Sequence, residues 1–288
     1  MTVRMLAGRA VGPIGIGTAR MSISEPVDEK EAIALLELAI DLGLNYVDTA
    51  MAYTTPEEPS HAESLVARLL AHRADEILVG TKGGHYRSGS EWLNDARPSA
   101  LRRNCEASLR ALAVDAIDLY YLHFPDPTIP IADSIGALEE LRAEGKVQAI
   151  GVSNVSREQL LAATAIAPIA AVQNPLSPYR SQERDVLTMC ESRGIAFVAS
   201  SPLGGTRRPV PLEQLSPVAT AVSKQLGVGI GTVWLAWMLR VSTAIIPVTG
   251  ARRRESLEAS WRATGLQLSD EQFTAIESDL RPALDEKG

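Results

Sequence analysis

The feature that most constrains the fold is a regular alternation of short, β-branched apolar runs with segments of helical periodicity. Repeated units of this kind build parallel strands joined by right-handed helical crossovers, so the sequence predicts an α/β protein. The expected strands are Leu44–Val47, Glu76–Gly80, Ile117–Leu122, Val147–Val152, Ala170–Val172, Ile195–Ala199 and Ala244–Val248. The expected helices lie near residues 28–42, 60–72, 98–112, 131–144, 156–165, 181–193 and 254–263.

A closed barrel requires one strand more than these seven. We place the eighth near Thr18–Arg20, where it would lead into helix 28–42. The Gly-rich stretch Met5–Gly17 would alternatively form a hairpin that plugs the barrel floor. The length suits a single-domain barrel. We therefore predict a (β/α)₈ TIM barrel that forms one domain over residues 1–288.

An open, doubly wound sheet is the competing architecture, and it needs a Gly-rich phosphate loop between its first strand and helix. Gly12–Gly17 resembles such a loop, but Pro13 interrupts it and no helix follows at once. Gly227–Gly231 lies between two helical patterns and does not follow a strand. Tight turns are the simpler interpretation of both stretches, which favours the barrel.

Composition excludes several classes of function. Apolar residues make up 45% of the chain and charged residues 22%, which is typical of a globular protein with a large core. The formal charge of −7 argues against a nucleic-acid or anionic-membrane partner. Cys105 and Cys190 match neither a disulfide framework nor a metal-ligand spacing, so we expect no metal and a reducing, cytoplasmic location. We expect no secretory signal and no membrane span.

Polar side chains follow one predicted strand after another. They are Asp48 and, five residues later, Tyr53, then Lys82, His123, Ser153 and Asn154, Gln173 and Asn174, and Ser200 and Ser201. Each has a simple structural explanation when taken alone. In a barrel, however, the carboxyl ends of all strands meet at one mouth, where active sites are built. The joint pattern therefore predicts a catalytic site at that mouth.

The combination of Asp48, Tyr53, Lys82 and His123 predicts a specific chemistry. A free tyrosine has a pKa near 10, and we expect the Lys82 ammonium to lower the pKa of Tyr53. Asp48 would keep Lys82 charged, and His123 would offer an N–H to a substrate carbonyl oxygen. Such a site protonates an alkoxide as it forms. Attack by hydride fits this best, and hydride requires a nicotinamide cofactor.

The same residues carry a resemblance to a known family. The chain resembles the aldo-keto reductases over roughly residues 14 to 265. The matching segments are Asp-Thr-Ala-x-x-Tyr at 48–53, Gly-Thr-Lys at 80–82, Asp-Leu-Tyr-Tyr-Leu-His at 118–123, Glu-Gly-Lys-Val-x-Ala-Ile-Gly-Val-Ser-Asn at 144–154, Val-Gln-Asn at 172–174 and Ser-Pro-Leu-Gly at 201–204. The resemblance implies a (β/α)₈ barrel, NADPH-dependent reduction of an aldehyde or ketone, and the tetrad Asp48, Tyr53, Lys82 and His123.

The resemblance also implies how the cofactor is held. Ser153, Asn154 and Gln173 would hold the nicotinamide carboxamide, and Ser201, Leu203 and Gly204 the pyrophosphate. The turn with Gly250, Arg252 and Arg253 leads into a helix whose N-terminus favours phosphate, which indicates NADP over NAD.

Two parts of this pattern depart from the family. Ser200 stands where an aromatic residue usually stacks on the nicotinamide. Ser256 and the pair Ala259-Ser260 replace residues that usually contact the adenosine.

The identity of the substrate is not specified by these patterns. The expected pocket residues are Met51, His85, Trp92 and Phe124, partly from a long segment between Gly83 and Arg97. Long segments at a barrel mouth commonly carry specificity. Two alternatives to the reductase are an NADP(H)-binding sensor of the same fold with little turnover, and a barrel lyase or isomerase that uses Lys82 as a Schiff base. Oligomeric state is left open.

Overall fold

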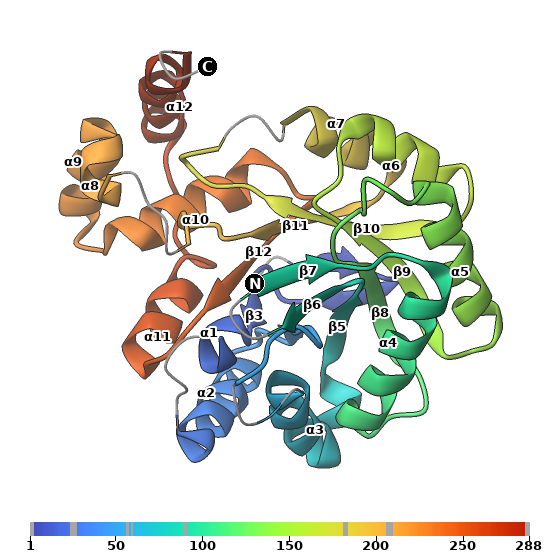
Figure 1. Cartoon of the computed structure of the whole chain (residues 1–288). Coiled ribbons are helices and arrows are strands. Elements are labelled where there is room, and N and C mark those ends of the chain that lie inside the picture. Colours follow the sequence, from blue (N-terminus) through green and yellow to red (C-terminus); the bar gives the residue numbers. More distant parts are fainter. Residues whose placement is uncertain are drawn as a thin grey trace.

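The computed structural model of the chain describes residues 3–23, 28–55, 58, 60–88, 91–180, 184–205 and 210–285. Eight parallel strands close into a barrel, and helices surround it (Figure 1). In barrel order the strands are β3 (Gly15–Gly17), β4 (Tyr46–Asp48), β5 (Leu78–Gly83), β8 (Ile117–Leu122), β9 (Val147–Ser153), β10 (Ile169–Pro175), β11 (Ala196–Ser200) and β12 (Ile245–Gly250). The predicted (β/α)₈ barrel is confirmed.

All seven strands expected from the sequence are present, with shifts of one to three residues at most ends. The helices that follow the barrel strands are α1 (Ala19–Ser22), α2 (Glu29–Asp41), α3 (His61–Arg73), α4 (Pro98–Leu112), α5 (Ile131–Ala143), α6 (Arg157–Thr164), α7 (Arg184–Arg193), α10 (Ile230–Val241) and α11 (Arg254–Arg262). A short 3₁₀ helix spans Ala74–Glu76. Residues 181–183, at the start of one predicted helix, lie outside the described residues.

The placement of the eighth strand at Thr18–Arg20 is wrong. The strand is Gly15–Gly17, and Thr18 is instead the N-cap of α1. Glycine is uncommon in strands, but here it is required, because a Cβ on Gly15 would lie 2.5 Å from the Tyr46 ring. The ring of Tyr46 fills the space inside the barrel that a larger residue would occupy.

The alternative expectation, an N-terminal hairpin over Met5–Gly17, is partly correct. β1 (Arg4–Leu6) and β2 (Arg9–Val11) form an antiparallel pair, which ends before the eighth barrel strand begins. Leu6 and Val11 belong to the apolar cluster that fills the barrel interior, together with Leu78 and Ala196 at the starts of their strands. The hairpin therefore seals the amino-terminal end of the barrel and leaves the carboxyl end for the site.

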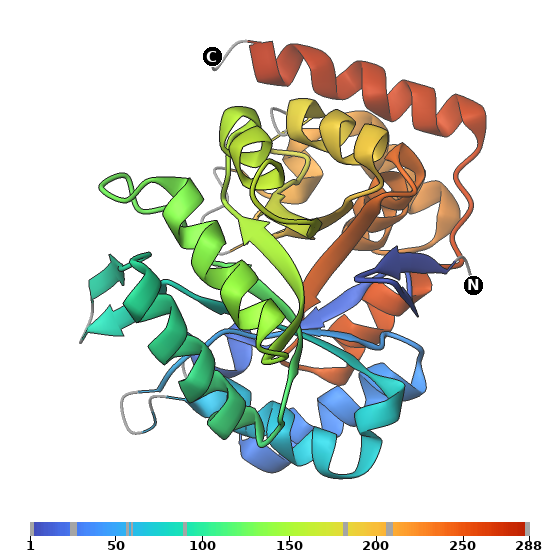
Figure 2. The same ribbon diagram turned by 90° about the vertical axis from the view of Figure 1, so that its right-hand side faces the viewer.

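A second, larger apolar cluster lies between the strands and the surrounding helices. Additional helices extend the carboxyl-terminal part of the chain: α8 (Leu212–Leu215), α9 (Pro217–Leu226) and α12 (Asp270–Asp285). Figure 2 shows α12 lying across the outside of the molecule. Its Glu277 accepts a hydrogen bond from Trp237 of α10 and pairs with Arg184 of α7.

Two helix ends carry residues that favour a helix boundary. The Asp28 side chain caps α2 by accepting from the backbone N–H groups of Lys30 and Glu31. Gly145, directly after the C-cap of α5, has a φ of +76°, a left-handed conformation that favours glycine at the end of a helix. Within the described residues, no helix combines the length and apolar character needed to cross a membrane.

Candidate active site

The barrel brings the predicted polar residues together at the carboxyl ends of its strands. Asp48 ends β4, Lys82 is the fifth residue of β5, and His123 follows β8 directly. Register places these strands side by side, with Asp48 opposite Gly80 and Lys82 opposite Tyr121. Strand alternation points Asp48, Lys82 and His123 into the barrel mouth.

Lys82 is at the centre of the group. Its side chain is fully buried, and its Nζ donates to Asp48 Oδ2 at 2.8 Å and to the Thr49 carbonyl at 2.7 Å. The same Nζ lies 3.4 Å from the Tyr53 hydroxyl. Three oxygen atoms thus surround one buried ammonium, which is the arrangement that a buried cation needs in order to be stable.

The pKa of Lys82 reflects two opposing effects. Burial alone would lower it, but the attraction of Asp48, and then of Tyr53, outweighs burial and raises the pKa above its ordinary value. Lys82 is therefore an ammonium at neutral pH. A charged lysine is a poor nucleophile, which argues against the Schiff-base alternative.

The sequence led us to expect a lowered pKa for Tyr53, and this prediction is wrong, because the pKa of Tyr53 in the structure lies above its ordinary value. Burial raises the pKa of Tyr53, and the opposing effect of Lys82 is smaller. The sequence indicates which charge lies nearby but not how deeply the phenol is buried, and here the desolvation of the phenolate is the larger effect. Tyr53 is therefore a neutral phenol at neutral pH and holds a proton that it can donate.

His123 lies beside Tyr53, with the two ring centroids 5.9 Å apart and the rings edge to face. Burial, and then the neighbouring Lys82, lower its pKa well below the ordinary value. The imidazole is therefore neutral. Its Nδ1 is buried and has no hydrogen-bond partner among the described residues. A neutral imidazole has one N–H to donate to an incoming oxygen atom.

Two buried tyrosines beneath the tetrad were not predicted. The hydroxyl of Tyr46 donates to Asp48 Oδ1 at 3.3 Å and lies 3.2 Å from the hydroxyl of Tyr121. A signal for them exists in the sequence, because Tyr46 precedes Asp48 by two residues and Tyr121 precedes His123 by two. Residues two apart on a strand face the same side, so these tyrosines form the layer that supports the site.

A cavity of about 620 Å³ opens beside the tetrad. Asp48 and Tyr53 line one part of it, and Ser200 and Ser201 another. Predicted cofactor residues on its wall are Gln173, Ser201, Leu203 and Gly250. Gln173 already donates to Asp48 Oδ1 at 2.7 Å, so it also fixes the carboxylate of the tetrad.

The predicted pyrophosphate segment forms a tight turn on the wall of this cavity. Ser201 has a φ of +50° and Gly204 a φ of +86°, and the backbone N–H of Gly204 donates to the Ser201 carbonyl at 2.8 Å. Ser201, Leu203 and Gly205 line the cavity, while Gly204 lies within the turn. Residues 206–209, which follow it, lie outside the described residues.

Helix α11 closes the far end of the cavity. Ser256 and Ser260 of this helix line the cavity, whereas Arg253 is its N-cap residue and Arg252 lies just before it. Neither arginine belongs to the lining. The two serines that replace the usual adenosine-side residues thus do face the cavity.

Arg20 was missed as a cavity residue. It lines the cavity from α1, and a Cβ added to Gly250 would lie 3.0 Å from its Cδ. The absence of a side chain at Gly250 therefore leaves room for Arg20 to lie along the strand end. Arg20 lies in α1 and not in the predicted strand Thr18–Arg20, so its place at the site was not expected.

Ser153 and Asn154 lie together next to His123, outside the lining of the large cavity. The Asn154 side-chain amide donates to the His123 carbonyl and to Ser153 Oγ, each at 3.0 Å. Asn154 has a left-handed φ of +57°, which turns the chain sharply after β9. This geometry fixes the two side chains close to the tetrad.

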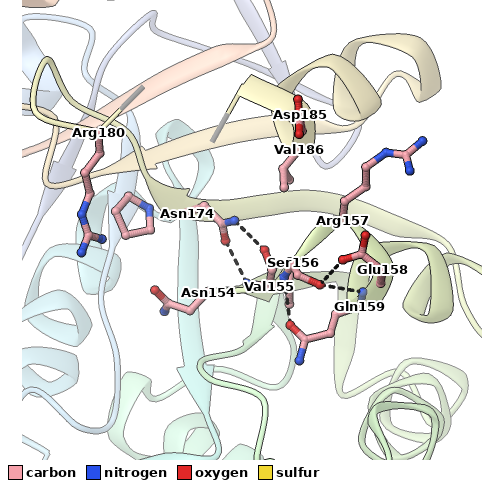
Figure 3. Close-up of a pocket in the computed structure, with 11 residues that line it drawn as sticks. Asn154, Val155, Ser156, Arg157, Glu158, Gln159, Asn174, Arg180, Asp185 and Val186 are labelled. Carbon is pink, nitrogen blue, oxygen red and sulfur yellow. Dashed lines mark hydrogen bonds between the residues drawn. The ribbon is translucent and has the colours of Figure 1, made fainter. Parts of the chain in front are cut away.

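A second hollow of about 570 Å³ lies on the other side of Asn154 (Figure 3). Its wall includes the capping box of α6, in which Ser156 and Gln159 bond reciprocally. Asn174 accepts from the Val155 N–H and donates to the Val155 carbonyl. No tetrad residue lines this hollow, and its polar groups hold the turn after β9 in place.

The predicted substrate residues form an aromatic group at the mouth. His85 stacks on Trp92, with ring centroids 5.1 Å apart, and contacts Phe124 at 4.6 Å and His123 at 5.0 Å. His85 and Trp92 belong to the antiparallel pair β6 (His85–Ser88) and β7 (Glu91–Asn94), which lies within the long segment between Gly83 and Arg97. Met51 is partly buried in the turn between Asp48 and Tyr53.

Comparisons with known proteins agree with this geometry. The family model described as the aldo/keto reductase family matches residues 13–280. An uncharacterized oxidoreductase of Schizosaccharomyces pombe is 31% identical over 274 residues, which span 93% of this chain and 87% of the relative.

Two solved structures share the fold over nearly all of both chains. A glycerol dehydrogenase from Gluconobacter oxydans superposes with a TM-score of 0.84 at 27% identity, over 98% of this chain and 96% of that one. An aldo/keto reductase from Klebsiella pneumoniae, in complex with NADP and acetate, superposes with a TM-score of 0.83 at 28% identity, over 96% and 94%.

Proposed function

We infer the activity of this chain from one premise: it belongs to the aldo/keto reductase family and is an oxidoreductase. We propose that it reduces an aldehyde or ketone to an alcohol with NADPH, and that Tyr53 supplies the proton. One observation carries this proposal. A single buried ammonium, that of Lys82, holds Asp48 at 2.8 Å and the Tyr53 hydroxyl at 3.4 Å on the wall of a cavity of about 620 Å³.

The cavity fits a nicotinamide dinucleotide phosphate. It runs from the tetrad to the N-terminus of α11, and Arg20 adds a positive charge to its wall. The missing side chain at Gly250 keeps that path open. Helix N-termini and arginines both favour phosphate groups. The chemistry that NADPH would supply in this cavity is transfer of a hydride to an electrophilic carbon.

The residues that would hold the cofactor divide along the cavity. Ser153, Asn154 and Gln173 would face the carboxamide, and Ser201, Leu203, Gly204 and Gly250 the pyrophosphate. Arg252, Arg253 and Arg20 would surround the 2′-phosphate side. Bidentate arginine contacts would give the preference for NADPH over NADH.

The tetrad residues divide the remaining work. The neutral imidazole of His123 orients the carbonyl oxygen by donating its N–H. Tyr53, a neutral phenol, donates its proton to that oxygen as negative charge develops, because an alkoxide is a stronger base than a phenolate. Lys82 stabilises the phenolate that Tyr53 becomes, and Asp48 keeps Lys82 charged and in place.

The aromatic wall of His85, Trp92 and Phe124, together with Met51 in the turn between Asp48 and Tyr53, would receive the rest of the substrate. Its apolar faces favour a carbonyl compound that carries an apolar or aromatic group.

Reduction of a carbonyl panel with deuterated NADPH tests this function. The panel contains aldehydes, ketones and keto-sugars, and the readouts are the loss of NADPH absorbance and the deuterium content of the alcohol product. We expect at least one carbonyl to consume NADPH and to carry deuterium on its carbinol carbon. NADPH binding without turnover of any panel member would contradict the proposal and favour an NADP(H) sensor.

The cofactor preference has its own test. Replacement of both Arg252 and Arg253 by alanine should weaken NADPH binding while leaving NADH binding unchanged. Equal loss for the two cofactors would show that the arginines do not contact the 2′-phosphate.

A further inference from the structure

A second group of side chains, outside the reductase site, contains ligands for a metal ion. A nitrogen of His61 and carboxylate oxygens of Glu29 and Glu58 lie within 4.8 Å of one another. They come from three segments: Glu29 begins α2, His61 begins α3, and Glu58 precedes α3 on the segment that leads from Tyr53. The fold thus places Glu29 beside Glu58 and His61, which are close to each other in the sequence.

The histidine is the decisive member, because it is buried rather than solvated. His61 is only 6% exposed, and its Nδ1 lies 2.8 Å from the hydroxyl of Ser22, which is itself 1% exposed. The other ring nitrogen, Nε2, has no hydrogen-bond partner among the described residues. Histidines that bind metals are held in the same way, with one nitrogen fixed by a neighbour and the lone pair of the other directed at the ion.

The negative charges of Glu29 and Glu58 favour a bound cation. The two carboxylates lie near each other, and the cation paired with them among the described residues is Arg68, at 2.8 Å from Glu29 Oε2. That pair is about half exposed and leaves the second oxygen of Glu29 for another partner. The nitrogen of His61 and the carboxylate oxygens, all within 4.8 Å of one another, are near enough to share one ion. A dication would neutralise both carboxylates at once.

We propose that Glu29, Glu58 and His61 bind one divalent transition-metal ion, of which Zn²⁺ is the best match. One imidazole nitrogen with two carboxylates is a donor set that such ions accept, whereas Mg²⁺ prefers oxygen ligands in a strict octahedron. Three protein ligands leave at least one position for water. The site is independent of the proposed reductase chemistry.

The ion would tie the segment after Tyr53 to the start of α2. The backbone N–H of Ala62 donates to the Tyr53 carbonyl at 3.2 Å, so α3 begins in direct contact with the tetrad tyrosine. Glu58 is fixed in the same turn, since its N–H donates to Thr55 Oγ1 at 3.0 Å. A bound ion would therefore hold Glu58 in a turn that borders the reductase site.

Calorimetric titration of the untagged, chelator-treated chain with Zn²⁺ tests the proposal. We expect one equivalent to bind and to raise the melting temperature, and Mg²⁺ at the same concentration to do neither. The variants His61→Gln and Glu58→Gln should lose at least about tenfold in affinity. His72→Gln is the matched control, because His72 lies at the other end of α3 and pairs with Glu37.

Folding of each variant is checked by its metal-free melting temperature and by NADPH binding, so that loss of metal is not confused with loss of structure. Glu29→Gln offers a third variant if His61→Gln does not fold. The proposal is overturned if the parent chain shows no saturable Zn²⁺ binding. It is equally overturned if folded His61→Gln binds as the parent does, or if His72→Gln loses as much affinity as His61→Gln.

Discussion

Replacement of Asp48 by asparagine should destabilise the protein far more than loss of one charge at the surface. Lys82 is fully buried, and Asp48 is its counterion at 2.8 Å. At that separation the attraction is about 6 kcal/mol for an effective dielectric constant of about 20. Removal of one member of a buried pair costs about 3–5 kcal/mol, because the other charge is left without compensation. That is a large part of a typical stability of about 5–15 kcal/mol.

Hydrogen bonding adds to the electrostatic loss. Asp48 Oδ1 accepts from Gln173 and Tyr46, and Lys82 Nζ lies 2.8 Å from both carboxylate oxygens. An asparagine has one acceptor oxygen, so its NH₂ group must face a donor on one of these two sides. An unsatisfied buried donor carries a further penalty.

Urea-induced unfolding at neutral pH measures the change. The matched control is Glu144→Gln, which breaks the solvent-exposed pair that Glu144 forms with Arg102 at 2.7 Å and should change stability little. The double variant Asp48→Asn/Lys82→Met should recover part of the loss, since no unpaired charge remains buried. A loss in Asp48→Asn no larger than that in Glu144→Gln would refute the reasoning.

The stability loss of Asp48→Asn should also change with pH in a defined direction. Without Asp48, burial is the main effect on Lys82 and lowers its pKa in the folded state. The unfolded state then binds more protons than the folded state between that lowered pKa and the unfolded value near 10.4. The stability deficit of Asp48→Asn should therefore shrink as the pH rises through this window. A deficit that grows with pH would contradict the assignment.

Three further predictions concern the site and its support. His123→Gln should lower kcat by about 10²–10³-fold without weakening NADPH binding. The pH profile of the parent rate should show no inflection from His123 near pH 6.5, because the pKa of His123 lies well below that value. A histidine-like inflection that disappears in the variant would contradict this. Gly151→Ala should lower the free energy of unfolding, measured in urea, by at least about 1–3 kcal/mol, because the added Cβ would lie 2.3 Å from Tyr121. The control Gly136→Ala in α5 meets no atom within 4 Å and should be neutral or stabilising. Equal effects of the two variants would show that the barrel interior yields to the extra carbon. Ser200→Phe should tighten NADPH binding by about 2–10-fold in a fluorescence titration if the added ring stacks on the nicotinamide, and unchanged affinity would refute that placement.

The periodic parts of the fold were predictable from the sequence. The seven strands read from β-branched runs are all present, because an inner strand of a parallel barrel is apolar on both faces. Gly15–Gly17 carries no such signal, since two of its three residues have no side chain. What makes it a strand is the space taken by the Tyr46 ring, which only the closed barrel reveals.

The grouping of the tetrad residues was predictable because Asp48, Lys82 and His123 lie at the ends of three neighbouring strands and Tyr53 lies in the turn after Asp48. Barrel geometry converts four separate sequence positions into one site, and the distances from Lys82 to Asp48 and Tyr53 agree with that. The direction of the Tyr53 pKa was not predictable, because it depends on how fully the phenol is buried. The place of Arg20 on the cavity wall was not predicted for a different reason. The eighth strand was expected at Thr18–Arg20, so Arg20 was assigned to the barrel wall and not to the cavity.

The proton-donor role of Tyr53 is the central claim, and the most direct measurement is the turnover of Tyr53→Phe beside that of Tyr120→Phe. Both variants remove one phenolic hydroxyl, but that of Tyr120 is fully buried and lies 3.5 Å from the Leu101 carbonyl, away from the tetrad. We predict that Tyr53→Phe lowers kcat by at least about 10²–10⁴-fold with NADPH affinity preserved, and that Tyr120→Phe keeps its turnover. Turnover by Tyr53→Phe at the rate of the parent chain would contradict the account.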